Sequence, residues 1–112
     1  MFSKRQNQVS SFIQKELGEL FLLKGAEWVP GKMLTISVVR ITKDLGIANI
    51  FLSVFPSGDA DKVIEDLNKK GSEIRYELGT RIRHSVRRIP ELRFHLDDSL
   101  DYIDRIDQAL KS

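Results

Sequence analysis

Apolar residues near the start of the chain recur every three or four positions, with Lys, Gln and Glu between them. They are Val9, Phe12, Ile13, Leu17, Leu20 and Phe21. This spacing is typical of an amphipathic helix, which we expect over about residues 4–23. Gly25, Pro30 and Gly31 then predict a loop. We expect Trp28 to pack beneath this loop, with contact to a partner as the alternative.

Residues 33–42 change to a two-residue period rich in β-branched side chains, which is typical of a strand. Alternation predicts two faces, one formed by Leu34, Ile36 and Val38 and the other by Thr35, Ser37 and Val39. A second stretch of this kind, residues 47–55, follows the short polar link KDLG. The two stretches therefore predict an antiparallel hairpin.

The stretch PSGDAD ends the second strand and supplies cap-type residues for a helix that begins at about Asp59 or Ala60. An apolar stripe then continues at helical spacing, and Gly71 occupies one of its positions. The other members are Val63, Ile64, Leu67, Ile74, Leu78 and Ile82. Because glycine inside a helix costs about 1 kcal/mol relative to alanine, we expect two helices that meet at residues 70–72, with the glycine at the bend.

A third strand is predicted after Pro90, where apolar and polar positions alternate again. Its apolar positions are Leu92, Phe94 and Leu96. A closing helix is expected to begin at Asp98 or Ser99 and to bury Leu100, Ile103, Ile106 and Leu110. The order α-β-β-α-α-β-α predicts a single α+β domain over residues 1–112, in which helices cover one face of a three-stranded sheet.

Composition limits the class of protein. With 112 residues and 41% hydrophobic positions, the chain can bury one core without a metal or a disulfide. The absence of cysteine excludes a disulfide framework and a cysteine nucleophile and favours a reducing compartment, so we expect a cytoplasmic protein. No apolar run is long enough to span a bilayer, and residues 1–15 are too polar for a signal peptide, so we expect neither membrane insertion nor secretion.

The formal net charge is only +2, but the charges are unevenly distributed. Six arginines lie close together, at Arg75, Arg81, Arg83, Arg87, Arg88 and Arg93. Five aspartates follow within positions 97–107. One end of the fold is therefore expected to be basic and another acidic.

The residues alone leave two main interpretations of this arginine cluster open, with a protein partner as a third. Guanidinium groups bind phosphate oxygens bidentately, so the cluster is suited to a nucleic-acid backbone. Alternatively, it is a solvated helix face paired with acidic neighbours, namely Glu73, Glu77 and Glu91. Lys69 and Lys70 extend the basic segment, yet each lies four positions after an acidic residue, which is an ordinary helix-stabilising pair.

Candidate catalytic and metal sites are scarce. His84 and His95 lie in different predicted elements, with no His or Cys at metal-ligand spacing. Asp97 and Asp98 are adjacent, and a helix cap beside a strand end explains them. No P-loop or dinucleotide fingerprint occurs. We therefore predict no enzymatic activity, no metal and no cofactor.

Three phenylalanines, Phe51, Phe55 and Phe94, are candidates for stacking on nucleic-acid bases. Burial in the core is the favoured interpretation for them. Because Phe51 and Phe55 share a strand face with Asn49 and Ser53, one of the two is expected to be exposed.

Three segments of the chain match motifs of a known family. The hairpin LTISVVRITKDLGIANIFLSV resembles the family's strand, turn and strand, and RRIPELRF resembles its Arg-x-x-Pro-Glu-Leu-x-Phe motif. The segment DDSLDYIDRIDQAL is similar to the closing signature of the family. With the first helix and IRYELGTRIR, these segments cover nearly the whole chain from about Arg5. The chain thus resembles ribosome-binding factor A, a family of bacterial small-subunit assembly factors.

This resemblance implies a type II KH-like fold, in which helices back a three-stranded sheet, with a kinked helix pair near Gly71. KH domains usually hold single-stranded RNA with a GxxG loop, whereas this family has an Ala-x-Gly kink. Lys70, Gly71 and Ser72 align with that kink and depart from its pattern. Arg40 is a second departure, since relatives often carry an acidic residue there.

The resemblance also implies a function. The family binds the free 30S subunit, contacts 16S rRNA near the decoding region and assists late maturation, including 5′-end processing, notably in the cold. The implied partners are the 30S subunit, 16S rRNA or its precursor, small-subunit ribosomal proteins and an assembly GTPase, and we expect a monomer.

The RNA-binding residues predicted on this basis are Lys69, Lys70, Gly71, Ser72, Arg75, Arg81, Arg83, Arg87 and Arg88. A rival prediction from another class is an RNA-independent adaptor that docks a protein through the hairpin edge or the Trp28 loop.

Overall fold

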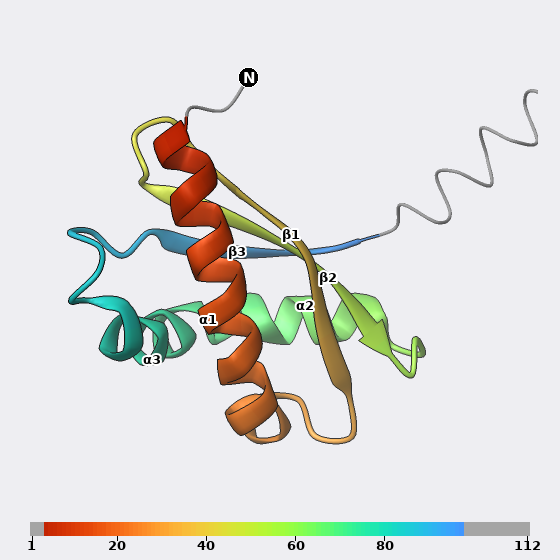
Figure 1. Cartoon of the computed structure of the whole chain (residues 1–112). Helices are drawn as coiled ribbons and strands as arrows, with labels where there is room; N and C mark the ends of the chain where they lie inside the picture. The colour runs from red at the N-terminus through yellow and green to blue at the C-terminus, as the bar shows by residue number, and fades with distance from the viewer. Residues whose placement is uncertain (1–3, 98–112) are drawn as a thin grey trace, which may run out of the picture.

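The computed structural model describes residues 4–97, which form three helices and a three-stranded sheet (Figure 1). In chain order the elements are α1 (Lys4–Trp28), β1 (Met33–Ile41), β2 (Ile47–Phe55), α2 (Ala60–Lys69), α3 (Gly71–Ile82) and β3 (Glu91–Leu96). The predicted α+β class and the predicted order of these elements are confirmed. The predicted closing helix, with apolar positions from Leu100 to Leu110, lies outside the described residues.

The strands follow the order β1-β2-β3 across the sheet. β1 and β2 form the predicted antiparallel hairpin, whereas β3 lies parallel to β2. Parallel strands need a crossover connection, and α2 and α3 provide it. The Glu91 amide donates a hydrogen bond of 2.9 Å to the Gly46 carbonyl, so the start of β3 lies directly beside the hairpin turn.

The helices of the described chain cover one face of the sheet and share one core with it (Figure 1). α1 crosses the strands, while α2 and α3 follow one another on the side of β3. Inward positions of β2 alternate with outward ones, as the two-residue period predicts. The predicted stripe is confirmed by four fully buried side chains, those of Leu67, Ile74, Leu78 and Ile82.

The opposite face of the sheet carries polar and aromatic side chains. The Phe51 ring stacks on the His95 ring with centroids 4.9 Å apart, and His95 Nε2 lies 2.9 Å from Asn49 Oδ1. Phe55, farther along β2, is 71% exposed, whereas Phe94 is only 1% exposed. The three phenylalanines therefore differ in environment, and the expected exposure of one of the β2 pair is confirmed.

A bulge in β1 changes which residues face the core. Ile36 pairs with Leu52 but Val38 pairs with Phe51, so the register shifts at Ser37. After this shift Val39 turns inward and is 4% exposed. The prediction that Val39 shares a face with Thr35 and Ser37 is therefore wrong, because strict alternation fails where one strand carries an extra residue.

α1 is longer than predicted. It continues through Gly25 to Trp28, so the expected loop begins only after the tryptophan. Trp28 is 4% exposed and meets the Phe21 ring edge-on, with centroids 6.0 Å apart. Burial of these two aromatic side chains offsets the cost of the helical glycine between them, which is about 1 kcal/mol. The predicted packing of Trp28 is confirmed, although its position in a loop is not.

The two consecutive helices meet where the sequence predicted, but the bend lies at Lys70. This residue has φ −97° and ψ 12°, outside helical geometry, whereas Gly71 already belongs to α3. A Cβ added to Gly71 would lie 3.7 Å from the Leu92 carbonyl oxygen, which is an ordinary contact. The expectation that the glycine supplies the bend is thus wrong, since the non-helical residue is Lys70 and Gly71 is the first residue of α3, in ordinary contact with β3.

None of the helices within residues 4–97 has the length and apolar character needed to cross a membrane.

Candidate nucleic-acid interface

The connection between α3 and β3, residues 83–90, holds three of the predicted binding residues and is called the arginine loop below. α3 ends at Ile82, and the Arg83 amide still donates to the Gly79 carbonyl at 2.9 Å. Arg83, Arg87 and Arg88 are exposed, whereas Pro90 at the end of the loop is buried. The apolar end of the loop is therefore anchored while the charged side chains project outward.

Arg75 fixes the path of this loop. Its Nη2 and Nε donate to the Ile89 carbonyl at 2.6 and 3.1 Å, and Nε also lies 3.2 Å from the Pro90 carbonyl oxygen. Hydrogen bonds from a charged donor are about twice as strong as neutral ones. Arg75 was predicted to bind RNA, and the structure places its guanidinium group on the loop backbone.

The arginine loop borders three surface grooves. One of about 630 Å³ lies against α3, one of about 490 Å³ lies between the helix junction and β3, and one of about 560 Å³ faces α1. Arg88 lines all of them. Several predicted residues thus converge on one region of the surface, namely Gly71, Ser72, Arg75, Arg83, Arg87 and Arg88.

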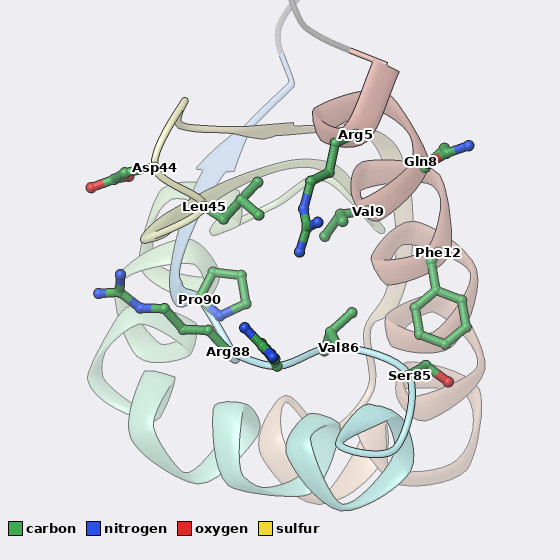
Figure 2. A pocket seen from close by; sticks show the side chains of 11 residues that line it. Arg5, Gln8, Val9, Phe12, Asp44, Leu45, Ser85, Val86, Arg88 and Pro90 are labelled. Carbon is green, nitrogen blue, oxygen red and sulfur yellow. The ribbon is translucent and has the colours of Figure 1, made fainter.

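Arg5 joins this region from the start of α1. Figure 2 shows its guanidinium group pointing into the groove of about 560 Å³, toward Val86 and Pro90 of the arginine loop. Sequence reasoning missed Arg5, because its separation from the loop in the chain gives no signal of their proximity. Only the packing of α1 across the fold brings them together.

Arg81, in contrast, forms a link between helices. Its Nη2 lies 3.1 Å from Glu16 Oε2 and 2.7 Å from Glu19 Oε2, and both carboxylates belong to α1. Only 27% of the Arg81 side chain is exposed. The paired guanidinium is therefore less available to a ligand than those of the arginine loop.

The two lysines before the junction also have partners within the fold. Lys69 Nζ lies 3.2 Å from Glu65 Oε1, the pair that the four-residue spacing predicted. Lys70 Nζ donates to the Trp28 carbonyl at 2.9 Å and joins the bend to the end of α1. Lys69 remains on an exposed surface, whereas Lys70 is half-buried.

Of the acidic neighbours named for the solvated-face interpretation, Glu91 pairs with an arginine of the cluster, whereas Glu77 pairs with a lysine of α1. Glu77 lies 3.0 Å from Lys24 Nζ, and Glu91 lies 3.3 Å from Arg93. Within residues 4–97, no carboxylate forms an ion pair with Arg83 or Arg87. The arginine loop thus offers guanidinium groups that the described fold does not neutralise.

Asp44, on the hairpin turn, is the carboxylate beside Arg88. Its Oδ1 accepts hydrogen bonds from Thr42 Oγ1 at 2.7 Å and from the Gly46 amide at 2.9 Å. The Thr42 hydroxyl lowers the pKa of Asp44 most, followed by the Gly46 amide, and the charge of Arg88 lowers it further. The carboxylate therefore organises the turn next to the interface.

Acid should weaken this turn in a defined pH range. Since the folded-state pKa of Asp44 is depressed, its stabilising effect is complete above the unfolded-state pKa and is lost as the pH falls below about 4. Urea unfolding of the wild type and Asp44→Asn should therefore differ at pH 6, with a difference that shrinks in acid. A difference that stays constant through this range would contradict the assignment.

Tyr76 is a second residue that sequence reasoning missed. It lies on α3 away from the buried stripe, is 71% exposed and lines the groove of about 630 Å³ with Arg83 and Arg87. The sequence did contain a signal for Tyr76, because an aromatic residue that lies outside the apolar stripe of a helix is expected at the surface.

The described residues contain no cluster of three or more His, Cys, Asp or Glu side chains that could hold a metal ion. The exposed guanidinium groups of Arg83, Arg87 and Arg88 are suited to binding anionic oxygens.

Comparison with known proteins decides the family. The model of the family "Ribosome-binding factor A" matches residues 5–110. The chain belongs to the ribosome-binding factor A family. Ribosome-binding factor A of Christiangramia forsetii is 37% identical over 110 residues, which cover 97% of this chain and 84% of the relative.

Two Thermus thermophilus structures of ribosome-binding factor A share the fold. The crystal structure superposes with a TM-score of 0.67 at 20% identity and covers 81% of this chain and 94% of its own. A homology model fitted into a cryo-electron-microscopy map of a 30S complex gives 0.59 at 22% identity, covering 77% and 88%. The KH-like fold predicted from the resemblance is therefore confirmed. Ribosome-binding factor A is a family of ribosome-binding proteins rather than of enzymes, in agreement with the predicted lack of catalysis.

Proposed function

We propose that this chain binds the 30S ribosomal subunit through 16S rRNA or its precursor, in the cytoplasm, and assists late maturation of the subunit. The observation that carries this proposal is the arginine loop, where the exposed side chains of Arg83, Arg87 and Arg88 line neighbouring grooves, with Arg88 common to all three. Support also comes from the Thermus thermophilus relative, which was fitted into the map of a 30S complex.

The mechanism is binding by charge and shape. Arg83, Arg87 and Arg88 bind phosphate oxygens, and Arg5 extends the basic surface across the groove that faces α1. Arg75 positions the loop through its carbonyl contacts, and Arg81 holds α3 against α1. Ser72 lines two of the grooves and Gly71 one, Lys69 is exposed at the end of α2, and Lys70 joins the helix junction to the end of α1.

Family membership supports the finer parts of the proposal. Assistance to 5′-end processing, importance in the cold, and cooperation with an assembly GTPase and small-subunit ribosomal proteins belong to this role. The chain acts as a monomer and contributes binding energy, while other factors cut the RNA.

Co-sedimentation with purified 30S subunits tests the proposal. The chain should pellet with the subunits, and its affinity should fall as salt rises, because each neutralised phosphate contributes about −0.7 to −0.9 to the log–log slope. Bovine serum albumin serves as a non-binding control. Failure to pellet at low salt would contradict the proposal.

A protein-interaction adaptor is the second candidate, favoured by an apolar patch at the open end of the hairpin. Met33 and Phe55 are paired across the two strands and are 63% and 71% exposed. The Trp28 loop no longer supports this candidate, since the indole is buried. Pelleting that persists unchanged at high salt would favour the adaptor.

A further inference from the structure

Tyr76 lies on the solvent side of α3 and differs from an ordinary exposed tyrosine because it shares a groove with several arginines. Within residues 4–97 its ring contacts no other aromatic ring, and its hydroxyl has no hydrogen-bond partner. It lines the groove of about 630 Å³ on which Arg83, Arg87 and Arg88 converge. With Arg75, which also lines this groove, a ring and four guanidinium groups border one open surface.

The spacing of α3 aligns this ring with small side chains and with one arginine. Ser72, Tyr76, Thr80 and Arg83 follow one another at intervals of four, four and three residues and so share one helix face. Ser72 and Thr80 are too short to cover the ring. One face of Tyr76 is therefore accessible to a flat ligand.

The opposite wall of the groove is fixed in place. Ile89 packs against α3 at Gly79, where an added Cβ would lie in ordinary contact, 3.5 Å from Ile89 Cγ1. Arg75 of α3 donates a hydrogen bond of 2.6 Å to the Ile89 carbonyl. These contacts hold the end of the arginine loop against α3, the helix that carries Tyr76, and so restrict the movement of this wall before a ligand binds.

The chemistry of the groove matches an unpaired nucleotide. Aromatic rings stack on base faces, and guanidinium groups bind the flanking phosphates. In a duplex the base faces are covered by neighbouring base pairs, so the ring could not be used. We infer that an unpaired base of single-stranded RNA stacks on Tyr76, while Arg83 and Arg87 bind its flanking phosphates; this inference rests on the proposed function.

Fluorescence anisotropy with two labelled RNAs tests the inference. One is a short single-stranded oligoadenylate, and the other is the same strand with abasic positions, which keeps the phosphates but removes the bases. Tyr76→Ala should weaken binding of the intact strand by about 5- to 150-fold and should leave the abasic strand unaffected. Tyr76→Phe retains the ring and should bind like the wild type.

The matched control is Phe55→Ala, which removes an equally exposed ring, also 71% accessible, outside the groove. It should not change either affinity. The inference is overturned if Tyr76→Ala binds the intact strand like the wild type, if Tyr76→Phe is as weak as Tyr76→Ala, or if the wild type does not bind the single strand.

Competition with oligoglutamate separates RNA from an acidic peptide. The inference would also be overturned if Tyr76→Ala weakened the binding of oligoglutamate as strongly as it weakens the binding of RNA. Co-sedimentation with 30S subunits decides the proposed function independently. Wild-type pelleting with no effect of Tyr76→Ala on oligoadenylate would leave that function standing and reject only the stacking role.

Discussion

Simultaneous replacement of Arg83, Arg87 and Arg88 by glutamine is expected to weaken 30S binding by about 10²- to 10³-fold at low salt. Each guanidinium group that binds a phosphate contributes roughly 1 to 1.5 kcal/mol, and all three side chains are exposed. The log–log salt dependence should become shallower by about 2 to 3 units. Co-sedimentation across a salt series measures both quantities.

Arg81→Gln is the matched control for Arg87→Gln, because each removes one positive charge from the same segment. Arg81 pairs with Glu16 and Glu19 of α1, so its loss should lower the free energy of unfolding by about 1–2 kcal/mol. Its salt slope for 30S binding should stay at the wild-type value. If Arg81→Gln and Arg87→Gln changed the salt slope of 30S binding equally, an ion pair within the fold would not identify an arginine as structural.

Periodicity predicted the elements well because burial on one face imposes a repeating pattern on each of them. The α3 stripe of Ile74, Leu78 and Ile82 is an example, since all three are fully buried. The bulge at Ser37 left no comparable signal, because an extra residue changes the pairing of two strands and not the local composition. The end of α1 was also missed, since contact between Phe21 and Trp28 outweighs the local effect of Gly25.

The charge pattern pointed to one basic segment as the candidate interface, but it could not distinguish arginines and lysines with partners in the fold from exposed ones. Arg81 and Arg83 are two positions apart in the sequence, yet Arg81 meets carboxylates 62 and 65 residues away. Lys70 similarly bonds a backbone carbonyl 42 residues away, a partner that no side-chain pattern encodes. The prediction therefore identified a segment, and tertiary contacts decide which cations of that segment remain available.

Phe94→Ala is expected to lower the free energy of unfolding by about 3–5 kcal/mol, which is a large part of the stability of a domain of this size. Phe94 is 1% exposed on β3, and its ring centroid lies 6.1 Å from that of Phe21 in α1. The Asn68 side chain bonds both its amide and its carbonyl, at 2.8 and 2.9 Å. Because β2 holds β3 on one side and Asn68 of α2 holds the Phe94 backbone on the other, the sheet cannot close the cavity that truncation leaves. Urea denaturation measures the change.

Phe55→Ala provides the comparison, since it makes the same truncation on the same sheet at a position that is 71% exposed. It should change the free energy of unfolding by no more than about 0.5 kcal/mol. Equal destabilisation by the two variants would show that the core does not depend on Phe94.

Phe55→Ala also bears on function, because Phe55 belongs to the apolar patch of the adaptor candidate. Unchanged 30S affinity in Phe55→Ala, beside a large loss in the arginine-loop variant, would leave RNA contact as the mode of binding.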